Sequence, residues 1–157
     1  MKKKHTLVLG VGNDILMDDG IGPRLADHLE KKDLIEDAEY HTINLGGLEI
    51  LEFIQGYKKV IFIDAIKTKD GVPGALYQFT PADFRETMHL SSLHDVNFLT
   101  ALKLGKRMKL DVTKDIHIIA IEIVEDTIFG VDFTPPLQAR YPEITEEVEE
   151  IVKTLCT

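Results

Sequence analysis

The sequence predicts an α/β sandwich in which helices cover both faces of a mostly parallel sheet with one antiparallel edge strand. Short apolar runs alternate with longer amphipathic segments along the chain, and this alternation indicates strands joined by crossover helices. One run, Val60-Ile61-Phe62-Ile63, is wholly apolar, as expected for a parallel strand buried on both faces. A segment rich in turn formers follows this run and predicts the chain reversal that an antiparallel edge strand requires.

The first half of the chain contains three predicted strands and two predicted helices. Gly10-Val11-Gly12-Asn13 ends the first strand, because glycine permits a tight turn. Pro23 fits the first turn of a helix that runs toward Lys32 with apolar residues at fourfold spacing. Gly46-Gly47 turns the chain into the second helix, and the third strand ends at Asp64. The predicted strands are 5–9, 39–45 and 59–63, and the second helix is 48–55.

The second half begins with the predicted reversal and continues with a helix and a buried strand. The segment Lys69-Asp70-Gly71-Val72-Pro73-Gly74 is dense in turn formers, so residues 75–79 are predicted to fold back as the antiparallel edge strand. Asp95 is predicted to cap a helix that runs to about Lys106. A near-continuous apolar run then predicts another strand at 116–123.

The last predicted element is a helix that follows a loop bracketed by Pro135-Pro136 and Pro142. Apolar residues form one stripe on this helix, and acidic residues lie largely on the opposite face, a pattern typical of a solvated helix surface. The stripe consists of Ile144, Val148, Ile151, Val152 and Leu155, and the acids are Glu146, Glu147, Glu149 and Glu150.

Length, composition and charge predict one cytoplasmic domain spanning residues 1–157, since domains most often have about 100 to 150 residues. Cys156 is the only cysteine, which excludes a disulfide within the chain and favours a reducing compartment. The net charge is −9, and Lys2-Lys3-Lys4 is the only basic cluster, so nucleic-acid binding is not expected. No apolar run approaches the roughly 18 to 20 residues of a membrane span.

The commonest catalytic motifs are absent from the sequence. There is no Gly-x-Ser-x-Gly elbow, His-Glu-x-x-His, Cys-x-x-Cys or Walker loop, which argues against the usual hydrolase, zinc and nucleotide sites. A dinucleotide turn starting at Gly10 would need a glycine where Ile15 stands. Chemistry must therefore come from acids and histidines at the ends of the strands.

Carboxylates follow the first and third predicted strands, where ligands bind in open α/β sheets. Asp18 and Asp19 precede a helix, and complementing the positive helix end is the alternative explanation for Asp18 in particular. Asp64 is predicted to lie at the mouth of a buried strand, where a charge requires a partner or a metal. Its alternative is structural pairing with Lys67.

Of the six histidines, only His89 and His94 fall in a predicted loop that enters a helix. His94 is the better candidate, because Asp95 could cap that helix and fix its entry. Two carboxylates and one imidazole on separate loops would form a mixed site with open coordination positions, suited to nickel, zinc or a similar divalent ion. The spacing alone leaves their convergence open. The other histidines, which fall in ordinary strand or helix positions, are His5, His28, His41 and His117.

In order and spacing, five segments resemble the hydrogenase maturation endopeptidases. The resemblance covers almost the whole chain, and its most specific part runs from Gly12-Asn13 through Gly22. The segments are Leu9-Gly10-Val11-Gly12-Asn13, Asp18-Asp19-Gly20-Ile21-Gly22, Ile63-Asp64-Ala65, Ser92-Leu93-His94 and Gly130-Val131-Asp132-Phe133-Thr134-Pro135.

The resemblance implies a three-layer α/β/α sandwich and an aspartyl-type peptidase activity. Members of this family remove a short C-terminal peptide from the large subunit of a nickel-iron hydrogenase after nickel insertion. The metal-contacting acid, the second acid and the histidine of the family correspond to Asp19, Asp64 and His94, which are the predicted catalytic and metal-contacting residues. Many members carry an acid before a Gly-Gly pair, whereas this chain has Asn44-Leu45-Gly46-Gly47, so any role of that acid is in doubt here.

The resemblance also implies that the nickel belongs to the substrate precursor, whose cysteines hold it, and that no organic cofactor is needed. A water activated by a carboxylate or by the metal is the expected nucleophile, without a covalent serine or cysteine intermediate. The expected partners are the large-subunit precursor and other hydrogenase assembly proteins. Two alternatives remain: a non-catalytic nickel or hydrogenase-assembly chaperone, and a magnesium-dependent receiver-type signalling domain.

Overall fold

In the computed structural model, residues 3–44, 48–86 and 93–157 are described, without the side chains of 84–86 and 93–98. These residues form a five-stranded sheet in the order β2-β1-β3-β5-β4. The strands are β1 (Thr6–Val11), β2 (Ala38–Ile43), β3 (Lys59–Ile66), β4 (Leu76–Phe79) and β5 (Ile116–Glu122). The helices are the short 3-10 helix η1 (Met17–Gly20), α1 (Ile21–Lys32), α2 (Glu49–Ile54), α3 (Pro81–Glu86), α4 (Leu93–Arg107) and α5 (Pro135–Leu155).

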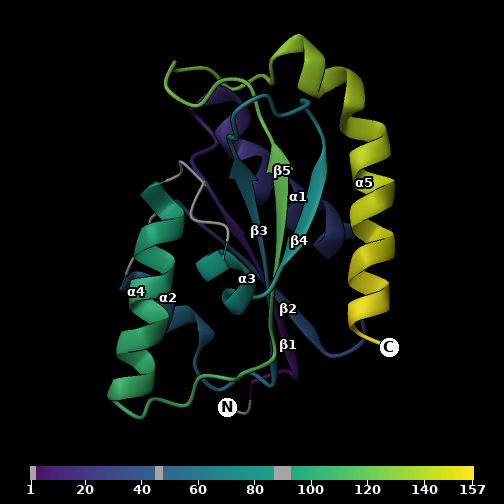
Figure 1. Cartoon of the computed structure of the whole chain (residues 1–157). Coiled ribbons are helices and arrows are strands. Elements are labelled where there is room, and N and C mark those ends of the chain that lie inside the picture. Colours follow the sequence, from purple (N-terminus) through teal and green to yellow (C-terminus); the bar gives the residue numbers. More distant parts are fainter. Residues whose placement is uncertain (1–2, 45–47, 87–92) are drawn as a thin grey trace.

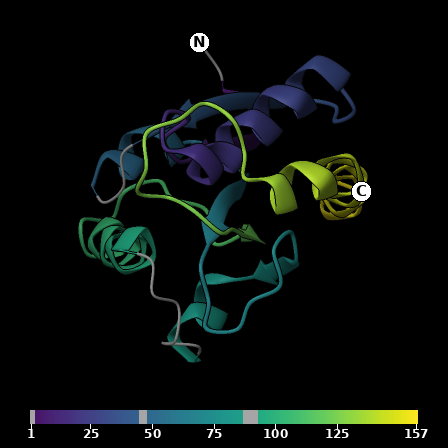
Figure 2. The same cartoon turned by 90° about the horizontal axis from the view of Figure 1, so that it is seen from above.

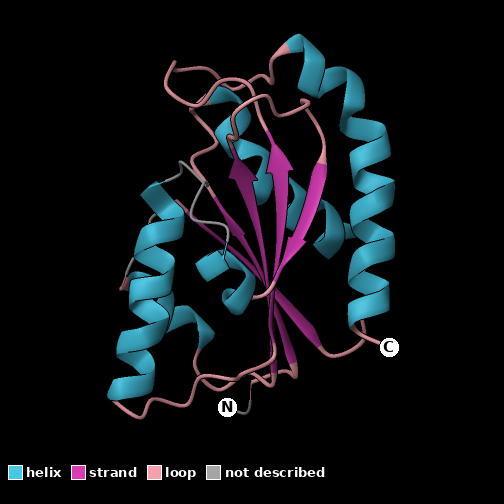
Figure 3. Cartoon of the chain, in the orientation of Figure 1, coloured by secondary structure: helices cyan, strands magenta, loops and turns pink. Residues whose placement is uncertain are grey.

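The sheet is parallel except at one edge, which confirms the predicted fold class. β1 pairs in parallel with β2 and β3, and β3 pairs in parallel with β5. β4 pairs antiparallel with β5, and Figure 3 shows its arrow running against the arrows of β3 and β5. The turn-rich segment after β3 therefore produces the reversal that the sequence predicts.

Two apolar cores lie on opposite faces of the sheet and produce three layers. Alternate strand residues point to opposite faces, so Val8 packs under α1 and α5 while Leu7 and Leu9 pack under α2 and α4. Figure 1 shows α4 and α5 on opposite sides of the sheet, and Figure 2 shows the same arrangement from above. Within the described residues, no helix combines the length and the apolar character that crossing a membrane requires.

The two central strands are longer than predicted. β1 continues through Gly10 and Val11, because Gly10 pairs with both Thr42 and Ile63 instead of starting a turn. β3 continues to Ile66, so the prediction that it ends at Asp64 is wrong. Pairing with β5 extends β3 through this region, and this partner strand is more than 50 residues away in the sequence.

Two helix starts also differ from the predictions. α4 begins at Leu93, so Asp95 lies within the helix and does not cap it. α5 begins at Pro135, and Pro142 lies inside the helix, so the predicted loop between these prolines is wrong. Proline fits the first helical turn, and within a helix it removes one backbone hydrogen bond and bends the axis. In Figure 1, α5 changes direction after its first turns.

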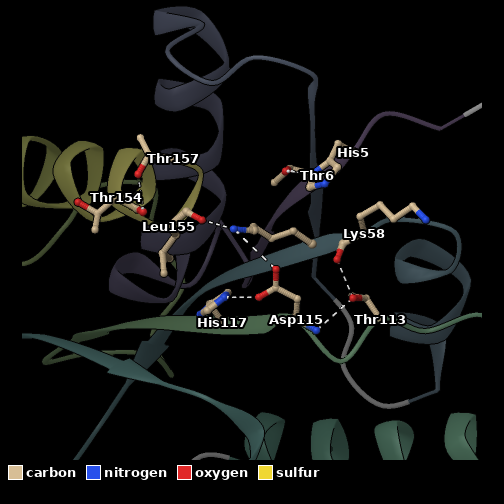
Figure 4. A network of polar contacts seen from close by, with 10 residues as sticks. His5, Thr6, Lys58, Thr113, Asp115, His117, Thr154, Leu155 and Thr157 are labelled. Carbon is tan, nitrogen blue, oxygen red and sulfur yellow. Dashed lines mark hydrogen bonds and ion pairs between the residues drawn. The ribbon is translucent and has the colours of Figure 1, made fainter.

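A polar network fixes the end of α5 to the amino ends of the strands (Figure 4). Lys59 donates to the carbonyl oxygen of Leu155 and lies 3.7 Å from the carboxylate of Asp115. His117 Nε2 lies 2.7 Å from Asp115 Oδ1, and the Thr113 hydroxyl donates to the Lys58 carbonyl oxygen at 2.6 Å. This end of the sheet is therefore held by structural ion pairs, which leaves the opposite end for the candidate site.

Candidate active site

The candidate site lies at the carboxyl end of the parallel strands. The segments that follow β1, β3 and β5 all leave the sheet at this carboxyl end, where open α/β sheets bind ligands. In Figures 1 and 2, the connection from β5 to α5 arches over the beginning of α1.

Two glycines allow the segment after β1 to fold against the sheet. A Cβ at Gly22 would lie 2.4 Å from the Ile63 carbonyl oxygen and 2.5 Å from that of Val11, so a side chain there would push α1 off the strands. Gly12 has φ +149°, and a Cβ there would lie 2.0 Å from the Asp19 carbonyl oxygen. The glycine spacing that resembles a nucleotide turn thus seats η1 and α1 close to the sheet.

Asp19 lies in η1 and is only 6% exposed. Its Oδ2 accepts a hydrogen bond from the Asn13 backbone N–H at 2.8 Å, which fixes the carboxylate relative to the end of β1. The 3-10 helix η1 contacts β3, the strand that contains Asp64. Asp19 therefore lies at the same end of the sheet as Asp64, the second predicted acid.

Asp64 lies within β3, where it is paired in register with Ala120 of β5. It is 8% exposed, and its Oδ1 accepts a hydrogen bond from the Ala65 backbone N–H at 2.8 Å. Lys67, the structural partner considered for Asp64, lies with its Nζ 3.4 Å from Asp126 Oδ1. Because Asp64 lies within a paired strand, the sheet fixes its backbone more firmly than a loop would.

The predicted third residue, His94, is the second residue of α4, and its side chain lies outside the described residues, as does all of His89. The convergence of Asp19, Asp64 and His94 therefore stays a prediction. Among the residues whose side chains are described, no three His, Cys, Asp or Glu side chains form a cluster able to hold a metal ion.

Asp18 has a structural role that the sequence did not predict. It is fully buried, and its Oδ2 accepts hydrogen bonds from the backbone N–H groups of Val124 (3.0 Å) and Glu125 (3.2 Å). Its two carboxylate oxygens also accept from the Thr134 N–H at 2.7 Å and the Thr134 hydroxyl at 2.8 Å. Asp18 therefore ties both ends of the connection between β5 and α5 to η1, a role different from complementing the helix end.

A hollow of about 520 Å³ lies between the carboxyl ends of β1 and β2 and helix α2. Its lining includes the acids Asp14, Glu49 and Glu52, together with Asn44. Sequence reasoning overlooked Glu49 and Glu52, although their position just after Gly46-Gly47 was a signal. The remaining lining residues are Gly12, Pro23, Thr42, Ile43 and Phe53.

A further buried carboxylate, Glu122, organises the segment after β3. It is 1% exposed and accepts hydrogen bonds from the Thr68 N–H at 2.8 Å and from the hydroxyl groups of Thr68 and Tyr77 at 2.5 and 3.2 Å. Sequence reasoning overlooked it, because it appears as the last polar residue of an apolar run. Its partners indicate a structural role.

The lone cysteine lies far from the carboxyl end of the sheet. Cys156 directly follows α5, and the carbonyl oxygen of Leu155, the last residue of that helix, accepts a hydrogen bond from Lys59 at the amino end of the sheet. Burial raises the pKa of the Cys156 thiol, which favours the unreactive protonated form. Position and pKa both argue against this thiol as a nucleophile.

The chain is similar in sequence to hydrogenase maturation proteases. Residues 23–152 match the family model for HycI, described as a hydrogenase maturation protease. A Methanocaldococcus jannaschii relative assigned as a hydrogenase maturation protease is 30% identical over 97% of this chain and 92% of its own length. The hydrogenase 2 maturation protease of Escherichia coli is 29% identical over 90% of this chain and 87% of its own length.

Solved structures share the fold. The hydrogenase maturating endopeptidase HybD from Escherichia coli superposes with a TM-score of 0.73 at 24% identity, covering 96% of this chain and 93% of its own. The [NiFe] hydrogenase maturation protease HybD from Thermococcus kodakarensis gives a TM-score of 0.72 at 24% identity, covering 98% and 99%. At this identity the structures are evidence for a common architecture.

Proposed function

This chain belongs to the hydrogenase maturation protease family, whose members are hydrolases, and we propose that it removes the C-terminal extension of a nickel-iron hydrogenase large-subunit precursor. The family model covers residues 23–152, most of the chain. The observation that carries the proposal is the pair of little-exposed acids, Asp19 and Asp64, on neighbouring elements at the carboxyl end of the parallel strands. Open α/β sheets bind their ligands at this end.

In this proposal, Asp19, Asp64 and His94 contact nickel that is already bound to the precursor. Carboxylate oxygens and an imidazole nitrogen suit a divalent ion of this kind. Contact with a metal held by the substrate positions the scissile peptide bond at the site, and only a loaded precursor is positioned in this way. Nickel then belongs to the substrate, and the enzyme needs no organic cofactor.

The reaction is hydrolysis of one peptide bond. A water oxygen bonds to the scissile carbonyl carbon, the C–N bond breaks, and a proton passes to the leaving amine. The water is activated by a carboxylate or by the metal. Covalent catalysis by Cys156 is disfavoured, because this thiol lies near the amino end of the sheet and its pKa is raised.

The proposal includes the cytoplasm as the compartment and other hydrogenase assembly proteins as further partners. A lone cysteine without a disulfide partner in the chain fits a reducing compartment. The receiver-type alternative fits poorly, because β4 runs antiparallel at the sheet edge and the family is that of proteases.

The test is a gel shift of the large-subunit precursor, with and without nickel, after incubation with the enzyme. Wild type should shorten only the nickel-loaded precursor. Asp64→Asn keeps the shape but removes the charge, and His94→Ala removes the imidazole, so both should abolish shortening while the thermal melt shows a folded protein. The controls Cys156→Ala and the double change Ser91→Ala, Ser92→Ala should process normally.

Each other outcome contradicts part of the proposal. Normal processing by Asp64→Asn, or equally fast cutting of nickel-free precursor, would show that these residues do not read the metal. Wild type that binds the loaded precursor without shortening it would support the chaperone alternative.

A further inference from the structure

An exposed apolar patch adjoins the proposed site. It consists of Ile15, Ile128, Phe129 and Val131, which are 48%, 58%, 79% and 60% exposed, and is called the Phe129 patch below. Single exposed apolar residues are ordinary on protein surfaces, but a contiguous group of large ones marks an interaction site. Aromatic side chains such as Phe129 are also enriched among the residues that dominate binding energy.

The backbone brings these residues together from two distant segments. Leu16 and Gly130 form an isolated parallel bridge. The Met17 N–H donates to the Gly130 carbonyl oxygen at 2.9 Å, and the Gly130 N–H donates to the Ile15 carbonyl oxygen at 2.9 Å. The four exposed apolar residues lie within two positions of this bridge, so the backbone brings them close together at the protein surface.

This surface is fixed relative to the proposed catalytic acid. Asp18 binds the connection at Val124, Glu125 and Thr134, on both sides of the Phe129 patch. Asp19 is the next residue along the chain. A polypeptide that binds the patch is therefore held next to the site where its peptide bond would be cut.

The charge around the patch selects the kind of partner. Residues 124–134 contain three acids and no lysine or arginine, and Asp14 lies next to Ile15. One of the three, Asp126, pairs with Lys67 at 3.4 Å, which leaves Glu125, Asp132 and Asp14 as the acids that give the rim its negative charge. Hydrogen bonds from Thr127, led by its backbone N–H, lower the pKa of Glu125, so this rim residue stays ionised. Two copies of this chain meeting at the patch would bring like charges together, which disfavours a self-complementary dimer.

We propose that the Phe129 patch docks the protein substrate through an apolar segment flanked by lysine or arginine, close to the bond that is cut. This inference rests on the proposed function and adds a docking surface outside the three metal-contacting residues. The apolar residues provide the contact area, and the acidic rim recognises the flanking cations.

The test measures cleavage of nickel-loaded precursor by wild type, Phe129→Ser and Met108→Ser at low salt. Met108 is also a large apolar residue, 58% exposed, but it lies just beyond the end of α4 and serves as the matched control. Phe129→Ser should raise KM roughly tenfold or more, as expected for loss of an aromatic anchor, with kcat changed less than about threefold. Met108→Ser should retain wild-type KM and kcat, and both variants should melt like wild type.

A second variant tests the charge component. Asp132→Lys should raise KM relative to wild type by a larger factor at low salt than at high salt, because salt screens the interaction between the rim and the substrate cations. The inference is overturned if wild type cleaves while Phe129→Ser keeps its KM, or if Phe129→Ser only lowers kcat. It is also overturned if wild type is a dimer that Phe129→Ser converts to a monomer. Failure of wild type to cleave any precursor would instead contradict the proposed function.

Discussion

Replacing Asp18 with alanine should destabilise the protein strongly, because this carboxylate is fully buried and accepts four hydrogen bonds. Water can replace it at Val124, which is 39% exposed, but not at Thr134, which is 8% exposed. Each buried donor left without a partner costs about 1 to 3 kcal/mol, and Thr134 has two such donors. The expected loss is therefore about 2 to 6 kcal/mol, out of a total stability of about 5 to 15 kcal/mol.

The assay is urea unfolding followed by circular dichroism, with Asp14→Ala as the control. Asp14 is an exposed acid four residues away, and its replacement should change the free energy of unfolding by no more than about 0.5 kcal/mol. A loss of about 3 kcal/mol would also lower Tm by roughly 6 to 12 °C. Hydrogen exchange should speed up at the backbone N–H groups of Val124, Glu125 and Thr134.

A double-mutant cycle locates the effect. Thr134→Val removes only the hydroxyl partner, so combining it with Asp18→Ala should cost less than the sum of the single changes, with a coupling of about 1 to 3 kcal/mol. If Asp18→Ala is no more destabilising than Asp14→Ala, the assignment of Asp18 as the residue that anchors the connection is refuted.

Three further predictions concern other polar and glycine positions. Glu122→Gln should lower the free energy of unfolding by about 1 to 3 kcal/mol, measured by urea titration, because an amide cannot accept all the hydrogen bonds of this buried carboxylate. Gly22→Ala should lower Tm and slow precursor processing, because its Cβ would collide with two strand carbonyl groups; an unchanged Tm would contradict the close approach. Tyr57→Phe should destabilise by about 1 kcal/mol at pH 7, because the Tyr57 hydroxyl donates to Glu39. That hydrogen bond holds the pKa of Glu39 below 4.5, so its contribution is complete above about pH 4.5 and is lost as the pH falls through the folded-state pKa. Urea titrations of Tyr57→Phe and wild type at several pH values should therefore converge in acid.

The sequence was informative wherever local pattern decides structure. The apolar run from Val60 to Ile63 predicted a buried central strand, and the turn formers after it predicted the antiparallel edge. Helix and strand ends were less predictable, because they depend on distant partners. Asp64 lies inside β3 because that strand pairs with β5, and Pro142 remains helical because neighbouring residues of α5 pack on the sheet.

The candidate site shows the same division. The sequence predicted that Asp19 and Asp64 lie at the same end of the sheet, because this inference needs only the order of strands and helices along the chain. It gave helix-end complementation as the alternative role of Asp18 but could not foresee its actual hydrogen bonds, because their partner Thr134 lies 116 residues away. The acids Glu49 and Glu52 were overlooked for a similar reason, because only the packing of α2 beside the ends of β1 and β2 makes them line a hollow.

The strand order imposes a sequence of events on folding. β3 and β4 are consecutive in the chain, yet β5 lies between them in the sheet, so neither can complete its pairing until residues 116–122 arrive. Such non-local pairing slows folding and leaves the apolar edge of β3 open to other chains in the meantime. The residues that anchor Asp18 follow β5, so the proposed site can assemble only after this insertion. A partly synthesised chain, or one in which β5 has not inserted, is therefore inactive and prone to aggregation.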